Sequence, residues 1–113
     1  MLNDAEIRQF RERLKAELSS LDAEDEHSAD DRSTVVLDQQ SVGRLSRMDA
    51  LQRQAMAEAT LRRRAARRQR IAAALDRINE GEFGYCLDCG EEIATARLDL
   101  DATVPNCVSC ARG

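Results

Sequence analysis

Apolar residues near the N-terminus recur at spacings of three and four, which is the pattern of a single apolar stripe on an α-helix. The stripe consists of Ile7, Phe10, Leu14, Leu18 and Leu21. Asn3 or Asp4 can cap the first turn. The Glu6 side chain can accept a hydrogen bond from the backbone N–H of Asn3, as in a capping box. The pattern predicts an amphipathic helix over residues 3–21.

This periodicity stops after Leu21. Residues 22–40 are rich in Asp, Glu, Ser and Thr, and the short apolar run of Val35, Val36 and Leu37 has no periodic continuation. We therefore predict a loop over residues 22–40, and we interpret His27 within it as a solvated surface residue.

A longer helix is predicted over residues 41–80. The segment has no proline and, after Gly43, no glycine before Gly81, and apolar residues from Leu45 to Ile78 continue through it. A helix of this length spans roughly 60 Å and needs a partner. We expect it to pair with the first helix as an antiparallel coiled-coil hairpin whose tip is the predicted loop. Self-association of the long helix between two chains is the alternative.

Composition agrees with a mainly α-helical chain that packs along narrow seams. Of 113 residues only three are aromatic, and 34% are charged, so a thick globular core is not expected. No apolar segment approaches the length of a membrane span, and the N-terminus lacks the basic and apolar regions of a secretory signal. We expect a cytoplasmic protein without membrane contact, and a monomer.

The net charge of -4 conceals two segments of opposite sign. Residues 21–31 hold six acidic side chains, whereas residues 61–70 hold six arginines, namely Arg62, Arg63, Arg64, Arg67, Arg68 and Arg70. We interpret the arginines as a solvated helix face balanced by Glu6, Glu12 and Glu17. Direct nucleic-acid binding through these arginines is the alternative, although the acidic net charge and the lack of base-stacking residues near the cysteines weigh against it.

All four cysteines lie near the C-terminus, in two Cys-x-x-Cys pairs. Cys86 and Cys89 form the first pair, Cys107 and Cys110 form the second, and seventeen residues separate them. This spacing is typical of a four-cysteine zinc site, in which each pair supplies one edge of a tetrahedron. Four protein ligands leave no position for water or substrate, so the predicted Zn²⁺ is structural and no enzymatic activity is expected.

Two other uses of the four thiols were weighed against zinc. Disulfides are disfavoured in the cytoplasm. A thioredoxin-like redox pair follows a strand in a βαβ unit, and the sequence shows no such unit.

The stretch GEFGYCLDCGEEIATARLDLDATVPNCVSC resembles the four-cysteine finger of the DksA/TraR family of bacterial transcription regulators. The resemblance rests on the Gly-Tyr-Cys entry, the Cys-x-x-Cys-Gly pair, Ile93, Arg97, Pro105 and the final Cys-x-x-Cys. The two predicted helices are similar to the helical hairpin of that family. The resemblance thus implies two domains, a hairpin over residues 1–80 and a zinc finger over residues 81–113.

This resemblance implies a protein that binds RNA polymerase, with its hairpin in the secondary channel, and that modulates transcription initiation. The tip motif of well-known members, Asp-x-x-Asp-x-Ala, is not present here. Asp38, Ser41 and Asp49 are nearest to its spacing and are the candidate polymerase-facing residues. The chain ends three residues after Cys110, where longer members continue into a helix, and a response to ppGpp is not inferred. A thiol redox protein is the least favoured alternative.

Overall fold

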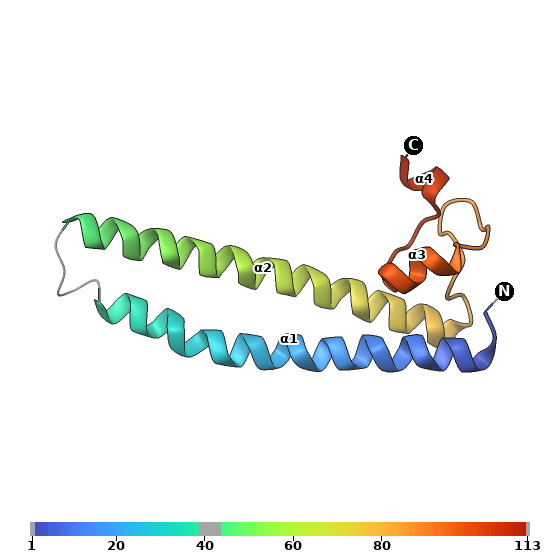
Figure 1. Cartoon of the computed structure of the whole chain (residues 1–113), viewed down its shortest axis with the longest axis horizontal. Coiled ribbons are helices and arrows are strands. Elements are labelled where there is room, and N and C mark those ends of the chain that lie inside the picture. Colours follow the sequence, from blue (N-terminus) through green and yellow to red (C-terminus); the bar gives the residue numbers. More distant parts are fainter. Residues whose placement is uncertain (1, 39–43, 113) are drawn as a thin grey trace. The chain divides into compact units, whose positions relative to one another are not determined.

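The computed structural model describes residues 2–38 and 44–112, without the side chains of residues 28–38, 44 and 45. Four helices follow in order: α1 (Asp4–Asp38), α2 (Arg44–Glu80), α3 (Thr95–Leu100) and α4 (Val108–Arg112). The long helices α1 and α2 pack as a hairpin, and the four-cysteine segment comes after them (Figure 1). The predicted fold class, a helical hairpin followed by a small cysteine module, is confirmed.

The first helix is much longer than predicted. It runs to Asp38 instead of ending at Leu21, so the prediction of a loop over residues 22–40 was wrong for residues 22–38. No proline or glycine occurs before Gly43, and acidic side chains of this segment form ion pairs with α2. Tertiary contacts therefore outweigh the weak helix propensity of Asp, Ser and Thr.

Both ends of the hairpin carry the expected helix signals. The backbone N–H of Glu6 donates to Asn3 Oδ1 (2.8 Å), and the N–H of Asn3 donates to Glu6 Oε1 (3.2 Å), which completes a capping box. After α2, Gly81 has φ of 75°, and the N–H groups of Gly81 and Glu82 donate to the carbonyls of Ile78 and Arg77. This Schellman motif ends α2 at the predicted glycine.

The chain forms two compact units. The first comprises residues 1–18 and 69–113, and the second comprises residues 19–68. In the first unit both ends of the hairpin share a core with the cysteine module, and this core includes Phe10, Leu14, Ile71, Ala74, Ile78, Phe83, Ile93 and Leu98. The rings of Phe10 and Phe83 lie 5.5 Å apart between centroids. The hairpin ends and the cysteine module are therefore stabilised together.

Charged contacts dominate the second unit. Among the side chains that the structure describes in this unit, Ala50 alone is both apolar and buried. Arg64 pairs with Asp25 (2.8 Å) and Glu24 (3.3 Å), and Arg68 pairs with Asp22 (2.9 Å) and with Asp25. Asp25 thus bridges two arginines of α2 from α1. The acidic segment and the arginine-rich segment, which looked separate in the sequence, neutralise each other here.

No helix within residues 2–38 or 44–112 is long and apolar enough to cross a membrane.

We predict that Asp25→Asn lowers the free energy of unfolding of the second unit by about 1 kcal/mol, because it removes the carboxylate that two partly buried guanidinium groups share. Urea unfolding followed by circular dichroism, with amide hydrogen exchange in residues 19–68, measures the loss. Glu26→Gln is the control, since it removes the same charge from an exposed neighbour and should have a smaller effect. Equal effects of the two variants would show that the bridge is not important.

Candidate metal centre

The first cysteine pair lies on a tight loop that directly follows α2. Tyr85 and Glu92 form an isolated antiparallel bridge. The N–H of Cys86 donates to the carbonyl of Glu91 (2.8 Å), and the N–H of Gly90 donates to the carbonyl of Cys86 (3.0 Å). Gly90 has φ of 77°, which is the left-handed region that favours glycine. These contacts fold the chain back on itself and turn two sulfurs to one side.

The second pair reaches the first by way of α3 and the segment after it. Cys107 immediately precedes α4, and Cys110 lies within it. The N–H of Leu87, in the first loop, donates to the carbonyl of Pro105 (2.9 Å). Asp101 Oδ1 accepts hydrogen bonds from both the N–H and the hydroxyl of Thr103 (3.0 and 2.7 Å). Hydrogen bonds thus hold the backbone between the two cysteine pairs in place, both within that segment and to the first loop.

Two arginines brace this connecting segment. Arg97 Nε donates to the carbonyl of Asn106 (3.1 Å), directly before Cys107. Arg77 of α2 donates to the carbonyl of Thr103 (3.4 Å), and burial lowers the pKa of its guanidinium. Arg97 was noted in the sequence only as part of the family resemblance, and Arg77 was not predicted to take part. Its partner lies 26 residues away, so no local pattern could have revealed it.

The four sulfurs have the arrangement that a tetrahedral metal requires. The Sγ atoms of Cys86, Cys89, Cys107 and Cys110 all lie within 4.8 Å of one another. The Sγ atoms of Cys89 and Cys107, one from each pair, are 3.7 Å apart. Four sulfurs about 2.3 Å from a central Zn²⁺ are separated by about 3.8 Å. The cysteines are free thiols rather than disulfides, and their donor set and spacing fit one Zn²⁺.

The thiols are unequal as acids. Backbone N–H groups at Cys107 and Cys89 lower the pKa of the Cys86 thiol to about 6. The neighbouring thiol of Cys107, followed by those of Cys86 and Cys89, raises the pKa of Cys110. The cluster therefore favours a negative charge on Cys86 and resists further ionisation nearby. A bound cation removes this conflict, because it stabilises all four thiolates together.

Comparison with known proteins agrees with this geometry. Residues 81–113 match the family model described as the prokaryotic dksA/traR C4-type zinc finger. The segment is thus similar to the finger of the DksA/TraR family. The resemblance seen in the sequence is thereby confirmed for the finger. A C4-type finger holds one Zn²⁺, as the four cysteines led us to expect.

Two individual proteins extend the comparison beyond the finger. The RNA polymerase-binding transcription factor DksA of Haemophilus influenzae is 40% identical over 42 residues, which are 37% of this chain and 29% of the relative. The match therefore spans less than a third of that relative's length. The structure of transcription factor DksA2 from Pseudomonas aeruginosa covers 97% of this chain and 83% of its own, with a TM-score of 0.84 and 22% identity. The fold of this chain is thus the DksA2 fold.

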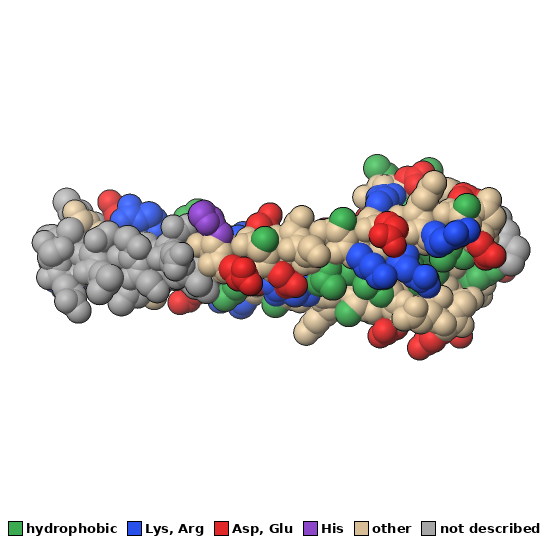
Figure 2. All heavy atoms as spheres, turned by 90° about the horizontal axis from the view of Figure 1, so that it is seen from below, with side chains coloured by type: hydrophobic (Ala, Val, Ile, Leu, Met, Phe, Trp, Pro, Cys, Tyr) green, Lys and Arg blue, Asp and Glu red, His purple; other side chains and the backbone are tan. Residues whose placement is uncertain are grey.

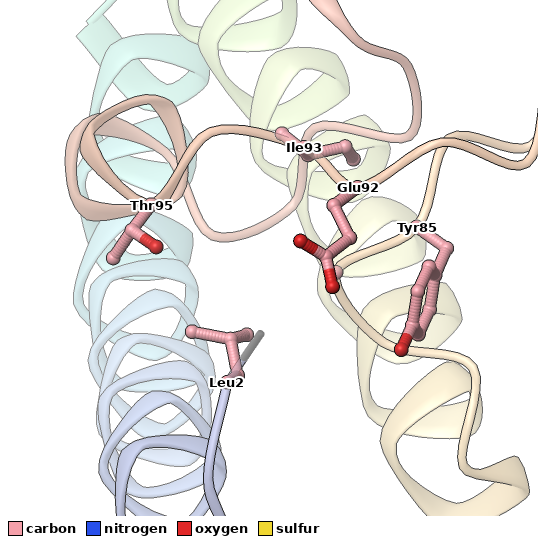
Figure 3. Close-up of a pocket in the computed structure, with 6 residues that line it drawn as sticks. Leu2, Tyr85, Glu92, Ile93 and Thr95 are labelled. Carbon is pink, nitrogen blue, oxygen red and sulfur yellow. The ribbon is translucent and has the colours of Figure 1, made fainter.

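A small hollow lies beside the DksA/TraR finger, where the N-terminus meets it. Leu2, Tyr85, Glu92, Ile93 and Thr95 surround it (Figure 3). Its volume is about 30 Å³, which is the share of liquid volume of one water molecule, so it is too small for an organic ligand. The adjoining Gly84 has φ of 93°, and a Cβ atom there would lie 3.1 Å from Leu2 Cδ1. Glycine at this position therefore allows the N-terminus to pack closely.

Of the predicted tip residues, Asp49 is the one whose side chain the structure describes. Asp49 is exposed on α2. Asp38 is the last residue of α1, and its side chain lies outside the described set, as does the whole of Ser41. Within residues 2–38 and 44–112, the four cysteines form the cluster that could hold a metal ion.

The arginine-rich segment is partly used inside the fold. Arg64 and Arg68 pair with Asp22, Glu24 and Asp25, and Glu6 caps α1. Arg62, Arg63 and Arg70 remain exposed. On the face shown in Figure 2, basic and acidic side chains of the described residues are interspersed. This mixture is unlike the continuous basic surface typical of nucleic-acid binders.

Zinc affinity should fall as the pH falls, because protons compete with the metal for each thiolate. Below about pH 6, the pKa of Cys86, metal binding must also displace the proton of Cys86. The plot of log affinity against pH should therefore be steeper by about one unit below this pH than above it. Competition with a chromophoric chelator across this range measures the slope. A constant slope would contradict the early ionisation of Cys86.

Proposed function

We propose that this chain is a transcription regulator that binds RNA polymerase. The observation that carries the proposal is the combination, in one chain, of a DksA/TraR finger and a hairpin with the DksA2 fold. The curated relative is named for RNA polymerase binding. By the family resemblance, the hairpin enters the secondary channel and modulates initiation without enzymatic chemistry of its own.

In this proposal Cys86, Cys89, Cys107 and Cys110 are the ligands of one structural Zn²⁺. The support is the separation of their sulfur atoms and the complete tetrahedron that they make. The metal, when bound, supplies a cross-link between the two loops. The residues around it hold the ligands in place: Gly90 permits the first loop, and Arg97 fixes the backbone before Cys107.

The part that acts on polymerase is placed at the tip of the hairpin, with Asp38, Ser41 and Asp49 as the polymerase-facing residues. Asp49 is exposed on α2. An exposed carboxylate can approach a catalytic metal ion or basic elements near it at little cost in desolvation. Direct nucleic-acid binding is the weaker proposal, because Arg64 and Arg68 already hold acidic partners.

Cys89→Ser is expected to prevent stoichiometric zinc binding, because a serine hydroxyl is a poor replacement for a thiolate ligand. The finger shares its core with both hairpin ends, so the first unit should loosen while residues 19–68 keep their helical structure. Elemental analysis and hydrogen exchange measure the two effects. Ser109→Ala, an exposed change between the second pair of cysteines, is the control. Full zinc content in Cys89→Ser would refute its assignment as a ligand.

The proposed function predicts that the purified chain binds core RNA polymerase and changes the yield of initiated transcripts. Asp38→Asn and Asp49→Asn should reduce the transcriptional effect severalfold while binding is retained, because only the charge near the reacting centre is lost. Glu58→Gln is the matched control on the exposed surface of α2. If the wild-type chain neither binds polymerase nor alters transcription, the proposed function is wrong.

A further inference from the structure

The two cysteine pairs differ in how firmly the rest of the chain holds them. Cys86 is buried, and Cys89 is exposed but lies on the tight loop that Gly90 closes. Cys107 and Cys110 are half-buried, and α4, which carries Cys110, has no buried residue. The position of the second pair therefore depends on the backbone that leads into it.

Residues 103–106 lead directly into the second pair, and we call them the lead-in segment. Three of their carbonyls accept hydrogen bonds from other elements. These bonds run from Arg77 of α2 to Thr103 (3.4 Å), from the N–H of Leu87 to Pro105 (2.9 Å), and from Arg97 of α3 to Asn106 (3.1 Å). The hairpin, the first cysteine loop and α3 thus each hold the lead-in segment at one point.

Arg77 links the lead-in segment to the hairpin. The Arg77 side chain is half-buried, and Thr103, whose carbonyl it contacts, is only 3% exposed. A charged donor forms a stronger hydrogen bond than a neutral one, and it is stronger still where water is scarce. Thr103 is also held from the other side, because Asp101 accepts hydrogen bonds from its N–H and its hydroxyl. The contact therefore joins α2 to a part of the lead-in segment that is itself well ordered.

Two ligand pairs on one chain bind a metal as a bivalent ligand does. After one pair has dissociated, its return depends on its effective concentration near the other pair, and a connection that holds the two in the bound geometry raises this concentration. Residues 90–106 connect the pairs. Each hydrogen bond that restricts the lead-in segment therefore keeps Cys107 and Cys110 close to the first pair.

We propose that Arg77 is a positioning residue for the metal centre, whose hydrogen bond to the Thr103 carbonyl holds the lead-in segment so that Cys107 and Cys110 are in place to bind Zn²⁺. Arg97 acts in the same way at the Asn106 carbonyl. Neither arginine is a ligand. This inference rests on the zinc ligands assigned in the proposed function, and it is independent of polymerase binding. It adds that α2 of the hairpin contributes to the affinity for the metal.

The test compares the zinc affinity of the full chain with that of Arg77→Met, by competition with a chromophoric chelator. Methionine keeps a long, unbranched side chain with good helix propensity but donates no hydrogen bond. Outer-shell hydrogen bonds of metal sites contribute about 10–100-fold to affinity. Because Arg77 acts on the backbone and not on a ligand atom, we expect the lower end, an affinity about tenfold weaker than that of the wild type.

Arg70→Met is the matched control. Arg70 lies about two turns before Arg77 on α2 and lines the same pocket, but it is exposed. The substitution removes the same charge from the same side of the helix and should leave zinc affinity close to that of the wild type.

Further variants separate positioning from a general loss of structure. Arg77→Lys keeps a charged donor and should recover part of the affinity that Arg77→Met loses. Arg97→Met leaves the hairpin unchanged and should also weaken zinc binding, and wild-type affinity in this variant would contradict the mechanism. At saturation, Co²⁺ should give the wild-type absorption spectrum in Arg77→Met, because all four thiolates remain. Unchanged circular dichroism excludes loss of the helices as the cause.

The outcomes separate this inference from the proposed function. If Arg77→Met holds zinc with wild-type affinity, Arg77 is not a positioning residue, and the proposed function stands. Equal losses in Arg77→Met and Arg70→Met would show that positive charge near the site sets the affinity, which also overturns the inference. If the wild type binds no zinc, the ligand assignment and this inference are both wrong. If the chain binds zinc as predicted but does not bind polymerase, the proposed regulator is wrong and the role of Arg77 stands.

Discussion

A small apolar core that joins both ends of the hairpin to the cysteine module is the constraint on which the rest of the first unit depends. The largest fully buried side chains, Leu14, Ile71 and Leu98, come from α1, α2 and α3 respectively. An α-helix of six residues, such as α3, is not stable alone, so α3 depends on this shared core. Without this core the two cysteine pairs would lack a support. With it, a metal can add the cross-link that so small a module needs.

The second unit is built on a different principle. Ion pairs centred on Asp25, Arg64 and Arg68 join its helices, and the apolar contribution from the described side chains is small. Partly exposed ion pairs contribute little individually, and salt weakens them. Complementary charge joins this helix pair, because acidic residues of α1 lie opposite arginines of α2. The arrangement leaves Met48, Leu51 and Met56 of α2 exposed.

These two principles suggest a division of labour within the proposed regulator. The four cysteines would supply every ligand of a bound Zn²⁺, so the metal would stabilise structure and leave no open position for a substrate. In the proposal, the hairpin makes the contact with polymerase, where exposed carboxylates such as Asp49 act.

Local chemistry by itself determined much of this protein. Asn3 and Glu6 specified the start of α1, Gly81 specified the end of α2, and the spacing of the four cysteines specified a zinc finger, because each of these depends on residues close together in the chain. The antiparallel pairing of the two helices also followed from the length of the second helix and the apolar stripe of the first, although the first helix proved longer than predicted.

Tertiary structure alone decided the remainder, because it depends on partners that are distant in sequence. Residues 22–38 have the composition of a loop, yet they are helical, with Asp22 and Asp25 paired to arginines of α2 about forty residues later. Arg77 likewise braces Thr103, and Met48 and Leu51 prove to be exposed although they continue an apolar pattern. A pattern shows that one face of a helix is apolar. Only packing decides whether that face meets the rest of the chain or is left for another molecule.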